Sequence, residues 1–209
     1  MKRRIFLSAL GLALAGALRP VAAQASLTRA DLDRLSAYLN GLGTVQTGFT
    51  QIAADGSQSR GSLLIRQPGR ARFEYDPPAR AMVLVGAGQI AIFDDRSNQG
   101  PQVYPLGVTP LAILLGRNID LASSGLVAAQ RQEAGRIFIL GQDPERPEMG
   151  RIELAFRRDP LQLEGWAIVN AAGETTQVIL DGLEPAEGVS VFDFDLETEL
   201  QRRGLTRTD

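Results

Sequence analysis

The sequence predicts a mainly β fold: an incomplete antiparallel β-barrel of about eleven strands, with short helices forming a lid over a hydrophobic cavity. Three observations predict it. Short apolar segments follow one another at roughly the 8–12-residue spacing of a meander, separated by Gly, Pro, Asp or Asn. One short, very apolar helix interrupts this series. Several of the strands are apolar on both faces, so the sheet needs other elements to cover it.

Residues 1–25 have the three parts of an export signal. Lys2, Arg3 and Arg4 form a basic start, residues 5–17 are apolar, and small residues end the segment. The apolar run is shorter than the roughly 20 residues that span a bilayer. We expect cleavage after Ala25, with Ala23 as the second choice, and a periplasmic location. A twin-arginine signal and an ordinary basic start both fit the pattern.

Without this signal, residues 26–209 suit a single domain. Four of the 22 basic residues lie in the signal, which leaves 18 arginines against 24 acids, a net charge of about −6. This acidic balance argues against a nucleic-acid partner. Lys2 is the sole lysine, and the sequence has no His and no Cys. Residues 26–209 therefore lack the groups for Ser-His-Asp triads, cysteine nucleophiles, Schiff bases and histidine-ligated zinc. Carboxylate chemistry is the main catalytic option left.

The first expected element of the domain is an amphipathic helix from Thr28 to about Asn40. Thr28 and Asp31 have the spacing of a capping box. Leucines recur at helical spacing after it, and Gly41 and Gly43 end the run. Strands are then expected at 44–53, 61–67, 71–76, 81–86, 89–95, 102–106, 125–132, 136–142, 151–157, 163–170 and 174–183, with a further candidate at 191–196.

The series of strands is broken at residues 109–126. Pro110 suits the first turn of a helix, and Gly116 can end it. Between them, Leu111, Leu114 and Leu115 make this short helix strongly apolar. It could plug one end of a closed barrel, or it could act with the first helix as a lid over an open one.

No set of carboxylates predicts an active site. Asp94 and Asp95 are adjacent on a strand and should point to opposite faces. Asp193 and Asp195 share one face of the candidate strand 191–196, whose wet edge would explain them. The acids of the loop 143–150 are too sparse for calcium. We therefore expect no enzyme activity, no cofactor and no metal.

An apolar stripe runs across successive strands. In "RQPGRARFEYDPP" (66–78), Arg70, Arg72 and Glu74 alternate with apolar residues and should face water. The stripe fits an ordinary core, and as a set it also fits a cavity for aliphatic ligands. Its members are Phe49, Leu63, Ile65, Ala71, Phe73, Tyr75, Val83, Val85, Ile90 and Ile92.

At these segments the protein resembles the periplasmic carriers of outer-membrane lipoproteins, the LolA family. The matching pieces are "GFTQ" (48–51), "GSLLIRQPGRARFEYDPP" (61–78), "LVGAGQIAIFDD" (84–95), "YPLGVTPLAILL" (104–115) and, more loosely, "LEGWAIVNAAGETTQVIL" (163–180). The resemblance implies an incomplete barrel whose cavity takes lipoprotein acyl chains. It places the family's cavity lining on Leu39, Ala71, Phe73, Val83, Leu111 and Leu114.

The resemblance also implies partners. Acylated lipoproteins would arrive from an inner-membrane ABC transporter and pass to the outer membrane, with an outer-membrane receptor as a further candidate partner. We expect the carrier to act as a monomer. A sensor or envelope-assembly module on the same fold, which binds lipid or a peptide as a signal, is the alternative. A carboxylate-dependent hydrolase is the third hypothesis.

One position departs from the family pattern. The family commonly has an arginine directly before the proline that ends the second strand, and this arginine holds the lid shut. Here that position is Gln67, and Arg66 precedes it. Arg66 should point to the opposite face. Gln67 can still donate a hydrogen bond, but without the strength that a charge adds.

Overall fold

The computed structural model describes residues 26–94, 96 and 100–205. The predicted export signal lies outside the described residues. No helix within the described ranges has the length and apolar character needed to cross a membrane. The helices are α1 (Arg29–Asn40), α2 (Leu111–Leu115) and α3 (Leu196–Arg202), with 3-10 turns η1 (Leu106–Val108), η2 (Pro147–Met149) and η3 (Val191–Phe194). The strands are β1 (Thr44–Ile52), β2 (Gln58–Arg66), β3 (Arg70–Tyr75), β4 (Ala81–Gly86), β5 (Gln89–Asp94), β6 (Gln102–Pro105), β7 (Val127–Glu133), β8 (Arg136–Gln142), β9 (Arg151–Arg158), β10 (Leu161–Val169), β11 (Thr175–Leu180) and β12 (Glu184–Pro185).

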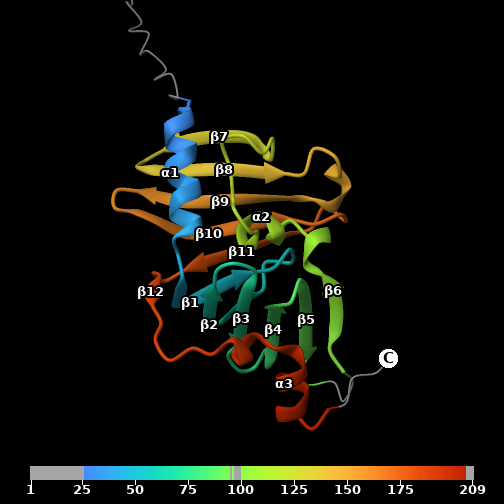
Figure 1. The fold of residues 1–209 in the computed structure, drawn as a ribbon. Helices are drawn as coiled ribbons and strands as arrows, with labels where there is room; N and C mark the ends of the chain where they lie inside the picture. Colours follow the sequence, from blue (N-terminus) through green and yellow to red (C-terminus); the bar gives the residue numbers. More distant parts are fainter. Residues whose placement is uncertain (1–25, 95, 97–99, 206–209) are drawn as a thin grey trace, which may run out of the picture.

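The strands form one antiparallel sheet in the order β6-β5-β4-β3-β2-β1-β11-β10-β9-β8-β7, with β12 paired to β1. The first strand therefore pairs with β11, and the two edges of the sheet, β6 and β7, come from the middle of the sequence. Residues 106–126 connect these edges and include α2, which lies between the two halves of the curled sheet (Figure 1). The predicted mainly β, open-barrel fold is confirmed, with the apolar helix in the connection between the sheet edges.

Helix α1 lies across the β7–β10 half of the sheet (Figure 1). The predicted capping box forms: the Asp31 amide donates to Thr28 Oγ1 at 3.2 Å, and the Thr28 amide donates to Asp31 Oδ2 at 2.9 Å. Leu35 and Leu39 are buried in the main apolar core. This burial, more than helix propensity, stabilises a helix of twelve residues.

Polar side chains of α1 hold the segment that follows α2. Ser36 Oγ accepts from the Leu121 amide at 2.9 Å. Asn40 exchanges two hydrogen bonds with the backbone of Ile119, at 2.8 and 2.9 Å. With the bond from Arg29 to Ser123 Oγ at 2.9 Å, four hydrogen bonds whose partners are far apart in the sequence attach this segment to α1.

The prediction of a strand at residues 191–196 is wrong. Residues 191–194 form the 3-10 turn η3, and α3 follows it directly. Asp193 belongs to a capping box with Ser190, and Asp195 caps α3 by accepting from the Thr198 amide at 2.8 Å. The hydrogen bonds from Thr198 hold the pKa of Asp195 below its ordinary value. The Ser-x-x-Asp spacing is a helix-start signal that the apolar alternation of "VFDFDL" obscured.

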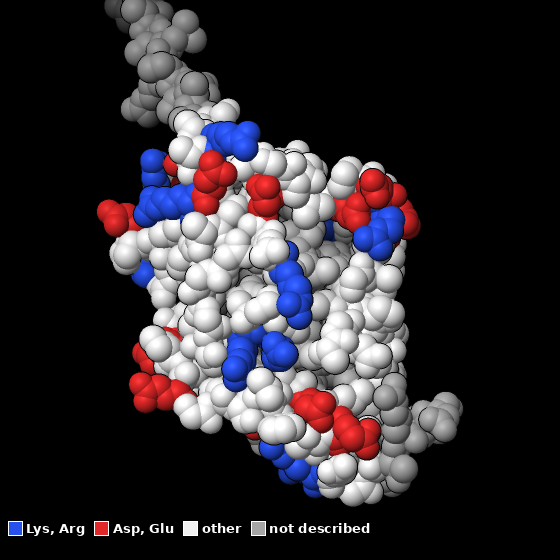
Figure 2. All heavy atoms as spheres, in the orientation of Figure 1, with Lys and Arg blue, Asp and Glu red and all other residues white. Residues whose placement is uncertain are grey.

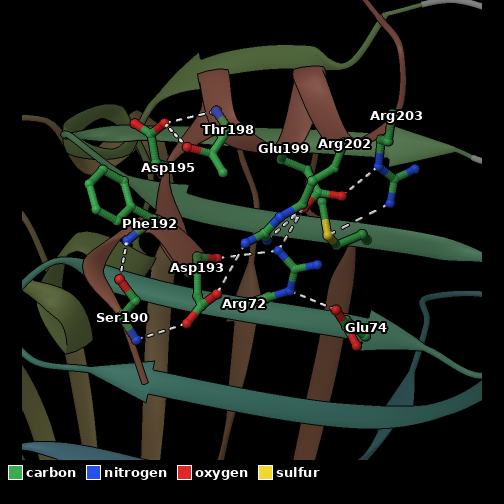
Figure 3. A network of polar contacts seen from close by, with 11 residues as sticks. Arg72, Glu74, Ser190, Phe192, Asp193, Asp195, Thr198, Glu199, Arg202 and Arg203 are labelled. Carbon is green, nitrogen blue, oxygen red and sulfur yellow. Dashed lines mark hydrogen bonds and ion pairs between the residues drawn. The ribbon is translucent and has the colours of Figure 1, made fainter. Parts of the chain in front are cut away.

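The expectation that Arg72 faces water is also wrong. Helix α3 covers the outer face of β3–β5, and the Arg72 side chain, 16% exposed, forms ion pairs with Glu199 at 2.9 Å and Glu74 at 2.6 Å (Figure 3). Glu199 is 5% exposed at its side chain and also accepts from Arg203 Nε at 2.7 Å. Burial acts to raise the pKa of Glu199, but the hydrogen bonds from Arg203 and Arg72 outweigh it and lower the pKa.

A second apolar cluster lies beneath α3. It explains why β4 and β5 are apolar on both faces: one face contributes to the main core and the other packs against α3. Its buried members are Met82, Leu84, Ala91, Phe93 and Leu200.

Candidate functional site

An apolar cavity of about 790 Å³ opens on the concave side of the sheet, beside the N-terminal end of α2. Strands from both halves of the sheet supply its walls, and the segment that leads into α2 supplies one side. The lining residues are Gln51, Phe73, Tyr75, Val83, Ile90, Tyr104, Val108, Thr109, Pro110, Leu111, Glu148, Met149, Trp166, Ile168, Asn170, Ala171, Thr176 and Val178. Its volume lies in the range usual for small-molecule sites.

The residues singled out from the sequence fall into three groups. Phe73, Tyr75, Val83, Ile90 and Leu111 line the cavity. Ile92 lies outside the main core and is 38% exposed, at the end of β5 away from the segment that leads into α2. The remaining apolar residues are buried in the core that continues from the cavity: Leu39, Phe49, Leu63, Ile65, Ala71, Val85, Leu114 and Leu115.

Aromatic rings in edge-to-face contact form one wall of the cavity. Phe73 lies 5.6 Å from Phe49 and 6.2 Å from Trp166, between ring centroids. Tyr75 lies 5.1 Å from Phe49, and its hydroxyl donates to Gln51 Oε1 at 2.7 Å. Burial raises the pKa of Tyr75 to about 12, so this hydroxyl stays neutral at physiological pH. The wall is rigid and apolar, with its one phenol satisfied inside the protein.

Helix α2 fills the interior next to the cavity. Leu111, Leu114 and Leu115 are all buried in the main core. The Gln67 side chain, between β2 and β3, donates from Nε2 to the Leu114 carbonyl at 2.7 Å. Gln67 Oε1 is buried and accepts no hydrogen bond among the described residues. The attachment of α2 to the sheet at this point is thus one neutral hydrogen bond beside an unsatisfied acceptor.

Arg66 lies on the other face of the sheet from the cavity. Its neighbour Ile65 is buried in the core, and the Arg66 guanidinium donates to the Val189 carbonyl at 3.0 Å. Arg66 therefore holds the C-terminal segment, and it does not contact α2 through any hydrogen bond found within the described residues.

A second contact attaches the segment that leads into α2. Arg146, in the loop between β8 and β9, donates to the Gly107 carbonyl at 3.4 Å. Asp143 orients this guanidinium through an ion pair of 2.8 Å. Hydrogen bonds from the Glu145 amide and then from Arg146 lower the pKa of Asp143. Asp143 thus serves turn geometry and an arginine.

Several lining residues were not predicted from the sequence. Trp166 and Ile168 on β10 and Val178 on β11 lie in segments that were expected to be strands, but their facing was not assigned. The period of two puts Trp166 and Ile168 on the same face, so the signal was present. What the sequence could not supply was the pairing of β11 with β1, which brings this wall opposite β3–β5.

Outside the cavity, the described residues contain few side chains that are arranged for catalysis or metal binding. Asp94 Oδ1 accepts from the Arg96 amide at 3.0 Å and so serves a turn, and Asp95 lies outside the described residues. Within residues 26–94, 96 and 100–205, no three His, Cys, Asp or Glu side chains gather closely enough to hold a metal ion.

Fold and site together define an open β half-barrel with an apolar cavity and a short apolar helix in the connection between its two edges. The protein belongs to the family described as outer membrane lipoprotein carrier protein LolA, whose model matches residues 40–197. This is a family of carriers and not of enzymes.

Curated relatives have the same description at modest identity. An outer-membrane lipoprotein carrier protein of Coxiella burnetii is 29% identical over 126 residues, which cover 56% of this chain and 58% of the relative. One from Methylococcus capsulatus is 26% identical over 181 residues, covering 77% of this chain and 86% of the relative. The alignment thus spans just over half the length of the first of these relatives. Among solved structures, a LolA superfamily protein from Nitrosomonas europaea matches 81% of this chain and 98% of its own, with 12% identity and a TM-score of 0.42.

Proposed function

We propose that residues 26–209 form a periplasmic carrier that holds the acyl chains of lipoproteins in the apolar cavity and takes them from the inner to the outer membrane. The observation that supports the proposal most directly is the apolar cavity of about 790 Å³, which is lined by Leu111 of α2 and adjoins the core that contains Leu114 and Leu115. Family membership supports the class of cargo.

Binding would rest on the hydrophobic effect. Each methylene removed from water contributes about 0.8 kcal/mol. A long acyl chain would therefore bind very tightly to an empty, rigid cavity, and a carrier that cannot release its cargo is of no use.

The lid offsets part of this affinity. Leu114 and Leu115 are buried in the core that adjoins the cavity, and an acyl chain entering past Leu111 would take their place. An incoming ligand must displace α2, so its net affinity is its own burial less the burial that α2 loses. The cargo can then still be released to an acceptor that binds it more tightly.

Gln67 would be the latch of this lid. Its bond to the Leu114 carbonyl lacks a charge, and its Oε1 has no partner in the described part of the protein. Both features favour easy opening, because a neutral hydrogen bond contributes only about 0.5–1.5 kcal/mol net. Arg146, through the Gly107 carbonyl, would hold the opposite side of the lid segment.

The remaining partners follow from the proposed route. An inner-membrane ABC transporter would load the cavity, and an outer-membrane acceptor or receptor would empty it. We expect the carrier to act as a monomer, because its cavity is complete within one polypeptide.

Two leucine variants test the proposal with matched burial. Leu114 on α2 and Leu200 on α3 are both 1% exposed, but they lie on opposite faces of the sheet. The measurement is the affinity of the purified domain for a dansyl-labelled fatty acid. If α2 competes with the ligand, Leu114→Ala raises the affinity about tenfold or more, since 1.4 kcal/mol is a factor of ten and Leu→Ala removes about 2–5 kcal/mol of packing. Leu200→Ala, the control, leaves the affinity unchanged.

The cargo itself needs a second measurement. The wild-type domain, added to spheroplasts, should release acylated lipoproteins that co-purify with it and are seen by native mass spectrometry. Absence of both fatty-acid binding and lipoprotein release would refute the carrier function. Fatty-acid binding without lipoprotein release would instead favour a lipid sensor.

A further inference from the structure

Three arginines gather around the turn between β2 and β3. Arg66 ends β2 and Arg70 begins β3, while Arg117 follows α2 and lines a small pocket together with Gln67 and Pro68. Figure 2 shows basic groups near the middle of the molecule, in the region where β2, β3 and α2 meet in Figure 1, and acidic groups only around the margin of that region.

None of the three is neutralised within the described part of the protein. Arg66 donates to the Val189 carbonyl at 3.0 Å and Arg70 to the Pro68 carbonyl at 3.4 Å, which are both uncharged acceptors. Arg117 is exposed. On the face of the sheet that α3 covers, by contrast, Arg72, Arg202 and Arg203 all pair with Glu199.

The register makes this arrangement unfavourable in the free protein. Arg66 and Arg70 lie directly opposite each other in the β2–β3 pair, and both are only partly exposed. Like charges at opposed positions of a β pair destabilise it, and partial burial reduces the screening by water. The sequence has 24 acids, yet the ion pairs found among the described residues include none with Arg66, Arg70 or Arg117.

We propose that Arg66, Arg70 and Arg117 form a docking surface for an acidic segment of a partner protein. Carboxylates of that segment would bind the guanidinium groups, whose planar forks suit bidentate contacts. Binding would also relieve the repulsion between Arg66 and Arg70. The surface lies outside the apolar cavity, so the inference goes beyond lipid binding and does not depend on it.

The net charge of the domain favours a protein partner over a membrane. Attachment to anionic lipid commonly uses clusters of about 4–8 basic residues, each contributing about 1 kcal/mol near the surface. Here three arginines stand on a domain whose net charge is about −6, so a broad anionic plane would repel most of the rest of the surface. A short acidic segment of a protein meets the three arginines without meeting the acids around them.

The test is an NMR titration of the ¹⁵N-labelled domain 26–209. The probe is a short blocked peptide of alternating Glu and Asp, and the same peptide with Gln and Asn serves as its control. We expect the acidic peptide to shift the amide signals of residues 66, 67, 69, 70 and 116–118 at low ionic strength, with a weaker effect as salt is added. The Gln/Asn peptide should leave these signals unmoved.

Two charge-matched triple variants decide where the peptide binds. Arg66→Gln/Arg70→Gln/Arg117→Gln should bind it roughly tenfold more weakly. Arg34→Gln/Arg60→Gln/Arg151→Gln removes the same charge from exposed arginines elsewhere and should bind like wild type. The spectrum of each variant without peptide shows whether it is folded.

Some results of the titration would contradict the proposal. Shifts that map to another surface, or equal weakening in both triple variants, would overturn the proposal. A co-sedimentation arm uses vesicles of phosphatidylglycerol and phosphatidylcholine. If these vesicles bind through the three arginines while the acidic peptide does not, the surface is a membrane site and the proposal is wrong.

Discussion

Helices α2 and α3 cover opposite faces of the same strands by different means. On the concave face, α2 buries three leucines and is attached to the sheet by a neutral hydrogen bond from Gln67. On the convex face, α3 buries Leu200, and Glu199 accepts charged hydrogen bonds from Arg72 and Arg203 (Figure 3).

The difference bears on which cover can be removed. Apolar burial is non-directional, so the contacts that α2 makes can be replaced by those of a bound acyl group. Nothing in an aliphatic ligand can replace the partners of Glu199, and lifting α3 would take Glu199 away from the buried guanidinium of Arg72 and leave it only the more exposed Glu74. We infer that α2 is the exchangeable cover and α3 the permanent one.

Removing the ion pairs that hold α3, the permanent cover, should have the largest effect on the free energy of unfolding. Glu199→Ala leaves Arg72 partly buried beside an empty position, and we expect a loss of about 3–5 kcal/mol in the free energy of unfolding. Urea unfolding followed by circular dichroism measures it. Glu197→Ala is the control, because Glu197 is exposed on the same helix, outside the network, and should change stability by less than about 0.5 kcal/mol. Equal losses in the two variants would show that the network does not hold α3.

The same network predicts a pH dependence. The pKa of Glu199 is lower in the folded protein than its ordinary value of about 4.3. A lowered folded pKa means that its contribution is fully present above the unfolded pKa and is lost as pH falls through the folded pKa. The difference in unfolding free energy between wild type and Glu199→Gln should therefore be constant near neutral pH and shrink below about pH 4. A difference that grows on acidification would reverse the assigned sign.

A stronger contact at Gln67, the proposed latch, should have a smaller effect, and this effect should be limited to ligand binding on the concave face. Gln67→Arg offers a charge-assisted bond to the Leu114 carbonyl and removes the unsatisfied Oε1, so it should close the lid more firmly. We expect the affinity for the dansyl-labelled fatty acid to fall about three- to tenfold, as 0.7–1.4 kcal/mol of extra closure would give. Gln58→Arg, at an exposed position of β2, controls for the added charge. Unchanged affinity in Gln67→Arg would mean that Gln67 is not a latch.

The smallest expected effect concerns the cavity wall. Tyr75→Phe removes the hydrogen bond to Gln51 and should lower the free energy of unfolding by about 1 kcal/mol while leaving the aromatic contacts in place. In wild type, absorbance titration should show one tyrosine ionising only near pH 12, where the pKa of Tyr75 lies. A wild-type titration in which every tyrosine ionises near pH 10 would contradict the burial of this hydroxyl.

The sequence was most informative where one rule governs a segment. Alternation placed Ala71 and Phe73 inward on β3, and the Thr28–Asp31 spacing predicted the start of α1. The apolar run at Leu111–Leu115 could be recognised as a helix, because leucines at this density fit no turn. Its position between the sheet edges could not, since that follows from the pairing of β1 with β11.

What packs against the outer face of the sheet could not be predicted from the sequence, for a related reason. The alternation at Arg70, Arg72 and Glu74 says only that these residues share a face away from the core. Whether that face meets water or another element depends on where the last twenty or so residues fold back, and contacts such as Arg72–Glu199 span 127 positions. Periodicity describes a strand locally, and it gives no information on what packs against it.

Hydrogen exchange of the two covers, with and without the dansyl-labelled fatty acid, tests the central claim most directly. The amides to follow are those of Ala112 and Ile113 in α2, and those of Glu199 and Arg203 in and directly after α3. We predict that saturating fatty acid lowers the protection of the α2 amides and leaves that of the α3 amides unchanged or higher. Loss of protection in both covers together, or an α2 whose protection is unaffected by bound ligand, would contradict the account.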